Sequence, residues 1–121
     1  MKILIVEDDV TLSRMYQKKF EHEGFVVSAA YAGNEGLSRA QREIPDVILL
    51  DIMMPGVDGF SVIRTLKKDE KTREIPIVIL TNLGTSEIFI TEAKRLGIVA
   101  YLIKYKTSSK EVVEVIKKAI G

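Results

Sequence analysis

Polar residues that could do chemistry stand directly after four short apolar runs in this sequence of 121 residues. Carboxylates that are brought together repel one another, so either one of them takes up a proton or a cation binds among them. The sequence offers oxygen ligands, no cysteine and no nearby histidine, a set that favours a hard cation such as Mg²⁺. The residues, in chain order, are Glu7, Asp8, Asp9, Asp51, Thr81 and Lys104.

Asp51 is the candidate for the reacting group. A cation among the acids would leave its carboxylate ionised and able to attack an electrophile. Thr81 and Lys104 supply a hydroxyl and an ammonium that could face an incoming anion. A carboxylate nucleophile, Mg²⁺, a lysine and a hydroxyl together indicate phosphoryl transfer to an aspartate, in which the protein contributes positioning and charge neutralisation.

These groups can meet only if the apolar runs are neighbouring strands of one sheet. The runs are rich in Val, Ile and Leu and nearly continuous in apolar character, which is typical of parallel strands that are buried on both faces. Proline at positions 45 and 76 lies just ahead of the third and fourth runs, where a helix could not continue. The expected strands span residues 3–6, 25–29, 47–50, 77–80 and 100–103.

Segments with helical spacing separate the expected strands. Each carries a single apolar stripe of the kind that packs a helix onto a sheet, although the second stripe is weak and the fourth, over residues 85–96, is narrow. Asp9 is a candidate N-cap, Ser108 and Glu111 have capping-box spacing, and Gly24 and Gly97 suit left-handed helix ends. The stripes comprise Leu12, Met15, Tyr16 and Phe20; Leu37 and Ala40; Phe60, Ile63 and Leu66; Phe89, Ala93 and Leu96; and Val112, Ile116, Ala119 and Ile120.

Strict alternation of five strands and five helices predicts an α/β fold with three layers, in which right-handed crossovers join parallel strands. The strand order 2-1-3-4-5 brings the acids of strands one and three together at the carboxyl edge of the sheet. Neighbouring strands lie about 4.8 Å apart and two strand spacings are about 9.6 Å, a distance that the long side chain of Lys104 can span back to Asp51. After Asp51, a proline and two glycines in residues 54–59 end the third strand and turn the chain, which leaves Asp51 at the sheet edge.

Composition narrows the possible classes of protein. Hydrophobic residues make up 46% and charged residues 29% of the chain, with a formal net charge of +1, so bulk charge does not indicate nucleic acid or membrane as a partner. We expect one domain over residues 1–121, without a signal peptide or membrane span, located in the cytoplasm. The many lysines and arginines of the C-terminal third form a solvated face by default and a partner surface as a second choice.

Together, four motifs resemble the receiver domain of two-component response regulators, whose fold is flavodoxin-like, and the resemblance extends over nearly the whole chain. Each motif alone is weak, but four in this order at expected strand ends are highly specific. They read IVEDD at 5–9, LDIMMPGVDG at 50–59, ILT at 79–81 and YLIK at 101–104.

The resemblance implies roles for the acids. Asp51 would be the phosphoacceptor and would take a phosphoryl group from a phosphohistidine of a sensor histidine kinase or a phosphotransfer protein. Asp8 would bind Mg²⁺ directly and Glu7 mainly through water, with Asp51 as a further ligand. The backbone carbonyl of Met53 would complete the protein ligands.

Further roles implied by the resemblance concern the switch. Lys104 and Thr81 would contact the phosphoryl oxygens, and Thr81 would move on phosphorylation while Tyr101 swings inward behind it. The surface of the fourth helix, fifth strand and fifth helix would bind a downstream protein or output domain, or a second copy in a phosphorylation-dependent homodimer. The domain would modify itself as a switch and would not be a metabolic enzyme.

Three positions depart from the family pattern. Tyr105 follows Lys104 where proline after a cis peptide is usual; because a cis bond before a non-proline residue costs about 2.5–4 kcal/mol, we expect a trans bond and a rearranged loop. Asn82 stands where a small residue is usual, which narrows access to the phosphoryl group. Met53 and Leu83 are apolar at two positions that govern water access, so we expect slow hydrolysis of the phosphorylated aspartate.

Other interpretations of the same residues stay open. The domain could be a pseudo-receiver, in which Tyr105 and Asn82 have ended phosphorylation and only an interaction module is left. A small Mg²⁺-dependent phosphohydrolase would need a proton-transferring acid at the place of Met53. A redox flavodoxin would need a phosphate-cradling loop after the first strand. Taken alone, Thr81, Lys104 and Tyr101 could each have a structural role, and His22 is assigned none.

Overall fold

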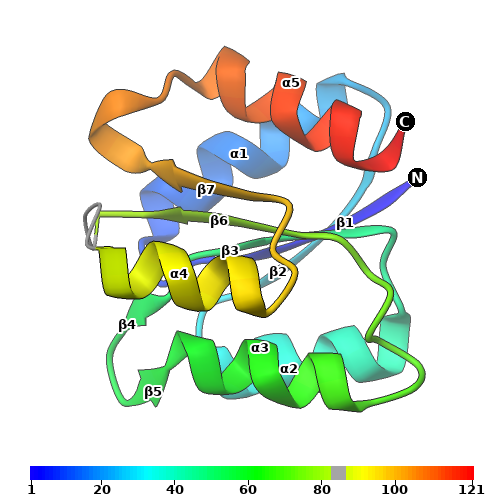
Figure 1. Cartoon of the computed structure of the whole chain (residues 1–121). Helices are drawn as coiled ribbons and strands as arrows, with labels where there is room; N and C mark the ends of the chain where they lie inside the picture. Colours follow the sequence, from blue (N-terminus) through cyan, green and yellow to red (C-terminus); the bar gives the residue numbers. More distant parts are fainter. Residues whose placement is uncertain (83–86) are drawn as a thin grey trace.

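A five-stranded parallel sheet forms the centre of the computed structural model, which describes residues 1–82 and 87–121. The strand order is β2-β1-β3-β6-β7, which confirms the predicted order of the five strands in the sheet. The carboxyl ends of these strands share one edge, on the left in Figure 1. The strands span Lys2–Val6 (β1), Val26–Ala30 (β2), Val47–Leu50 (β3), Ile77–Thr81 (β6) and Ala100–Ile103 (β7).

Helices cover both faces of the sheet, as predicted. Figure 1 shows α1 and α5 on one face and α2, α3 and α4 on the other. A short 3₁₀ helix, η1, over Lys104–Lys106 joins β7 to α5. The α-helices span Val10–His22 (α1), Gly33–Glu43 (α2), Gly59–Lys68 (α3), Glu87–Arg95 (α4) and Ser109–Ile120 (α5).

The continuous apolar runs arise because both faces of the sheet are buried. Along β1, Ile3 and Ile5 pack into the core beneath α1 and α5, whereas Leu4 and Val6 pack into the core beneath α2 and α3. Adjacent residues of a strand point to opposite faces, so a strand between two cores has apolar residues at every position.

Four predicted signals at helix ends are confirmed. The side chain of Asp9 accepts a hydrogen bond from the Leu12 amide at 3.1 Å, and Ser108 and Glu111 form both bonds of a capping box. Gly24 and Gly97 adopt φ of +92° and +74°, conformations that glycine reaches without steric cost. These local signals therefore set where the chain leaves and re-enters the sheet.

Three details were not predicted correctly. Met15 is exposed, and Ser13 is buried on α1 in its place. Ile44 ends α2 with φ of +46°, although a β-branched residue rarely adopts this conformation. The chain after β3 forms an unpredicted antiparallel hairpin, with β4 over Met53–Met54 and β5 over Val57–Asp58. The first two residues of the expected fourth helix, 85 and 86, lie outside the described residues.

None of the helices within residues 1–82 and 87–121 combines the length and the apolar character that crossing a bilayer requires.

Candidate functional site

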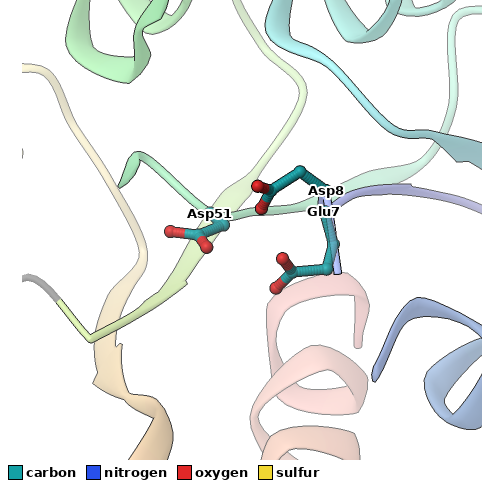
Figure 2. Close-up of side chains that lie close together, drawn as sticks. All are labelled: Glu7, Asp8 and Asp51. Carbon is teal, nitrogen blue, oxygen red and sulfur yellow. The ribbon is translucent and has the colours of Figure 1, made fainter. Parts of the chain in front are cut away.

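The ends of β1 and β3 bring three carboxylates together. Glu7, Asp8 and Asp51 each offer an oxygen, and these oxygens all lie within 4.8 Å of one another. Figure 2 shows the three side chains around one space at the carboxyl edge of the sheet. Glu7 and Asp51 are only 5% and 4% exposed, whereas Asp8 faces solvent. The predicted convergence of the acids is therefore confirmed.

Local hydrogen bonds orient the two buried carboxylates. The backbone amide of Asp9 donates to Glu7 Oε2 at 3.0 Å, and the amide of Met53 donates to Asp51 Oδ1 at 2.9 Å. The Asp51 amide itself donates to the carbonyl of Val6 at 3.0 Å, which extends the β1–β3 ladder to the site. Each buried acid is thus held by the backbone two residues further along the chain.

Lys104 reaches the acids from the end of the edge strand β7. Its Nζ lies 2.8 Å from Asp51 Oδ2 and 2.6 Å from Glu7 Oε1. The Lys104–Tyr105 peptide bond is trans, as expected for a residue that is not proline. The expected reach across the intervening strand β6 is confirmed.

Burial and ion pairing shift the pKa values of Glu7 and Lys104 in opposite directions. Burial raises the pKa of Glu7, and the hydrogen bonds from Lys104 and the Asp9 amide only partly oppose this. Burial alone would lower the pKa of Lys104, but hydrogen bonds to Asp51 and Glu7 outweigh it and raise the pKa. Lys104 therefore stays protonated and offsets part of the negative charge.

The donor set fits a hard divalent cation. The cluster offers carboxylate oxygens of Glu7, Asp8 and Asp51 within reach of one ion. Mg²⁺ is held in proteins by few carboxylates and several waters, and Asp8 is open to water. A surface hollow beside the cluster is lined by Asp8, residues 52–54 and Pro55, so an ion can approach from solvent.

The loop that follows Asp51 is tightly folded. Met53 pairs with Asp58 in the β4–β5 hairpin, and Asp58 Oδ1 caps α3 by accepting a hydrogen bond from the Phe60 amide at 3.0 Å. A Cβ on Gly59 would lie 2.4 Å from the Cα of Ile52, so only glycine lets the loop close. This packing fixes the backbone around Met53, whose side chain is 56% exposed.

Thr81 and Tyr101 lie on the two strands beyond Asp51. Thr81 is the last residue of β6 and is completely buried. Tyr101, on β7, is half-buried, and its hydroxyl is enclosed without a hydrogen-bond partner among the described residues. Burial, and to a smaller extent the charge of Asp51, raises the pKa of Tyr101. Their assigned roles as switch residues stay predictions.

Of the three positions expected to tune access to the phosphorylated aspartate, the structure describes two. Met53 and Asn82 are exposed, and Leu83 lies outside the described residues. Tyr105 is 69% exposed, and the ammonium of Lys106 lies 5.8 Å from the centre of its ring. His22, to which no role was assigned, is also exposed, at the end of α1.

Sequence reasoning missed one set of charged residues close to this loop. Arg64 on α3 contacts Asp58 Oδ2 at 3.3 Å and Glu92 Oε1 on α4 at 3.1 Å. Arg95 also binds Glu92, with the shortest distance at 2.8 Å. Arg64 and Glu92 are 28 positions apart, so no local spacing in the sequence could have indicated their contact.

Known proteins resemble this chain in sequence and in structure. The PleD response regulator of Caulobacter vibrioides is 48% identical over 82 residues, which is 68% of this chain and 18% of PleD. Protein PilH of Pseudomonas aeruginosa is 39% identical over 105 residues, 85% of this chain and 84% of PilH. The structure of the chemotaxis protein CheY4 of Vibrio cholerae has a TM-score of 0.88 at 27% identity, covering 98% of this chain and 97% of CheY4.

Several relatives are much longer than this chain, which spans about a fifth of PleD and a third of the transcriptional regulator RpaA of Synechocystis. The family model of the response regulator receiver domain matches residues 3–117. This chain therefore belongs to the receiver domain family of two-component response regulators.

Proposed function

We propose that this domain accepts a phosphoryl group on Asp51 from a phosphohistidine of a sensor histidine kinase or phosphotransfer protein, in a Mg²⁺-dependent reaction. The observation that carries the proposal is the acidic cluster with a lysine ammonium 2.8 Å from Asp51. An anionic nucleophile flanked by a cation and a metal-binding carboxylate pair suits transfer of a charged phosphoryl group.

Asp51 acts as the nucleophile. One carboxylate oxygen forms a bond to phosphorus while the phosphorus–nitrogen bond of the phosphohistidine breaks, and its electron pair stays on the imidazole. Lys104 is already bound to Asp51 Oδ2, so its ammonium can move to an oxygen of the incoming group. Thr81, at the end of the adjacent strand, donates its hydroxyl to another phosphoryl oxygen.

Glu7, Asp8 and Asp51, with the carbonyl of Met53, would hold the magnesium ion. When bound, Mg²⁺ neutralises the negative charge shared by the acids and the phosphoryl group. The amide bonds that orient Glu7 and Asp51 keep their carboxylates aimed at this space before any ligand arrives. The protein therefore has little reorganisation to make when the ion binds.

Phosphorylation then switches the surface formed by α4, β7 and α5. Thr81 moves toward the phosphoryl group, and the ring of Tyr101 packs into the space behind it. The altered surface binds a downstream protein or output domain, or a second copy of the domain. The domain is a signalling switch in the cytoplasm, not a metabolic enzyme, and it binds neither nucleic acid nor membrane itself.

Met53, Asn82 and Leu83 govern how quickly water reaches the phosphorylated aspartate. Apolar side chains at the first and last of these positions hold water poorly, so the phosphorylated state decays slowly. Met53→Asn is expected to shorten its lifetime, which loss of the phosphorylated mass after removal of the donor would measure. An unchanged rate in this variant would contradict the role of Met53.

Intact mass after incubation with acetyl phosphate and Mg²⁺ tests the proposed function. The wild-type chain should gain the mass of one phosphoryl group, and neither Asp51→Asn nor wild type in excess chelator should do so. An unmodified wild type that also fails to bind beryllofluoride with Mg²⁺ would support the pseudo-receiver interpretation. Modification of Asp51→Asn to the same extent would place the reaction elsewhere.

A further inference from the structure

Four side chains of alternating charge run from the hairpin after Asp51 to α4. Asp58 contacts Arg64, Arg64 contacts Glu92, and Glu92 contacts Arg95, at 3.3, 3.1 and 2.8 Å. Figure 1 shows the hairpin at the start of α3 and α4 alongside α3, which is the arrangement that these contacts bridge. We call these four residues the α3–α4 network.

Asp58 joins the network to the metal-binding loop. Its backbone pairs with Met53, its Oδ1 caps α3, and its Oδ2 binds Arg64. A shift of Asp58 therefore moves the Met53 backbone and the start of α3 together. Gly59 packs against Ile52 with no room for a Cβ, so the hairpin and the start of α3 have little freedom to move separately.

Glu92 joins the network to α4. Its side chain is 23% exposed and accepts hydrogen bonds from two arginines, three of them from Arg95 at 2.8–3.0 Å and one from Arg64 at 3.1 Å. The Nη1 atom of Arg64 donates a hydrogen bond to Glu92, and its Nη2 donates one to Asp58. A single planar guanidinium therefore connects α4 to the hairpin. A lysine has no planar fork and cannot reproduce this geometry.

We propose that Arg64 is a positioning residue whose guanidinium holds the β4–β5 hairpin, and with it Met53, in place relative to α4. Magnesium binding at the acidic cluster and the ordering of α4 are therefore coupled through Arg64. This inference rests on the proposed function, since it takes the acidic cluster to be a magnesium site. Such coupling is reciprocal: what α4 does to the affinity for Mg²⁺, Mg²⁺ does to the stability of α4.

The size of the effect follows from exposure. Arg64 is 39% exposed and Asp58 62%, and exposed ion pairs contribute little individually. A network that includes bidentate contacts between arginine and carboxylate restrains its side chains more strongly than a single exposed ion pair does. We expect Arg64→Ala to weaken Mg²⁺ binding about threefold.

Calorimetric titration with Mg²⁺ of the full chain tests the coupling. The variants are Arg64→Ala, Arg64→Lys, Glu92→Gln and the double variant that combines Arg64→Ala with Glu92→Gln. Arg73→Ala is the matched control. Arg73 has the same charge and contacts only its neighbour Glu74 among the ion pairs of the described residues. The control should bind as wild type does, and Arg64→Lys should recover less than half of the lost affinity.

The double variant isolates the route of the coupling. Glu92→Gln should weaken Mg²⁺ binding in the wild-type background and have no further effect once Arg64 is alanine. Hydrogen exchange supplies a second readout: Mg²⁺ should slow exchange of the α4 amides in wild type and in Arg73→Ala, but not in Arg64→Ala. If Arg64 had a purely structural role, Mg²⁺ would slow exchange of the α4 amides in Arg64→Ala as well.

The possible failures can be told apart. A wild type that binds no Mg²⁺ would overturn the proposed function and this inference with it. A wild type that binds Mg²⁺ while Arg64→Ala and Arg73→Ala bind equally well would overturn the inference alone. If Arg64→Ala does not fold, Arg64→Lys and Glu92→Gln carry the test, and wild-type affinity in both overturns the inference.

Discussion

Two ionic clusters of this domain pair carboxylates with cationic side chains, one in a buried setting and one nearer the surface. At the acidic site, formed by Glu7, Asp8, Asp51 and Lys104, the two paired carboxylates are almost completely buried. In the α3–α4 network, formed by Asp58, Arg64, Glu92 and Arg95, side-chain exposure ranges from 23% to 66%.

The two clusters shift the pKa of a glutamate in opposite directions. Glu7 contacts a lysine at 2.6 Å, yet its pKa is raised because burial penalises the charged form more than its partners favour it. Glu92 contacts Arg95 at 2.8 Å, and its hydrogen bonds to this arginine lower its pKa because they outweigh the desolvation that opposes them. The pairing distance alone therefore does not decide whether an ion pair stabilises; burial does.

The largest expected difference is in stability after loss of one cation. Lys104→Met leaves Glu7 and Asp51 buried without a counter-charge, so the free energy of unfolding should fall by about 2–3 kcal/mol in chelator. Arg95→Ala removes an exposed partner and should cost about 0.5 kcal/mol. Urea denaturation measures both, and equal losses would mean that burial does not distinguish the two clusters.

Addition of metal should stabilise the acidic site, and it should do so without Arg95, which contacts Glu92 but not the hairpin. At ten times its dissociation constant, Mg²⁺ should raise the free energy of unfolding of wild type by about 1.4 kcal/mol, since it binds the folded state. Arg95→Ala should gain as much, whereas Asp8→Asn, which lacks a ligand, should gain less. Thermal unfolding with and without chelator provides the measurement, and an equal gain in Asp8→Asn would remove Asp8 from the site.

High salt should reduce the stability cost of a substitution in the network more than that of a substitution at the acidic site, and this difference is smaller than the ones above. In 1 M salt the screening length is about 3 Å, so the cost of about 0.5 kcal/mol for Arg95→Ala should fall toward zero. Buried charges are screened much less, and the cost of Lys104→Met should be largely retained. A double series of urea titrations in low and high NaCl checks this, and a parallel decline of both costs would contradict it.

The smallest effect is the opposite pH dependence of the two glutamates in chelator. The pKa of Glu7 is raised above 4.5, so the folded state binds its proton more tightly and stability falls as pH rises through the folded pKa. Glu7→Gln should therefore gain on wild type as pH rises. The pKa of Glu92 is lowered from 4.5, so its contribution is present above that pH and lost as pH falls through the folded value.

Glu92→Gln should accordingly lose stability relative to wild type near neutral pH and match it in acid. Unfolding free energies measured from neutral to acidic pH for the three proteins give both slopes. Slopes of the same sign would show that the two carboxylates have similar environments.

Much of the fold and part of the site could be predicted. The β3 strand and the acids at the strand ends were predicted because they depend on local patterns, namely continuous apolar runs and the polar residues that follow them. The strand order was predicted because it brings these acids together. The left-handed Ile44 was not, since glycine or asparagine is usual there. It results from the turn into β3, where Pro45 ends the helix and the Asp46 amide must reach the carbonyl of Lys2 at 2.9 Å.

The amino-acid sequence by itself determined which groups stand at the carboxyl edge of the sheet, because an apolar run marks a strand buried on both faces and parallel strands end at one edge. Tertiary structure alone decided that Lys104 pairs with Glu7 in addition to Asp51 and that Arg64 connects the hairpin to α4. It also decided the direction of each pKa shift. The reason is that Coulomb attraction and desolvation depend on distance and burial in the folded chain, and neither is encoded by the spacing of residues along it.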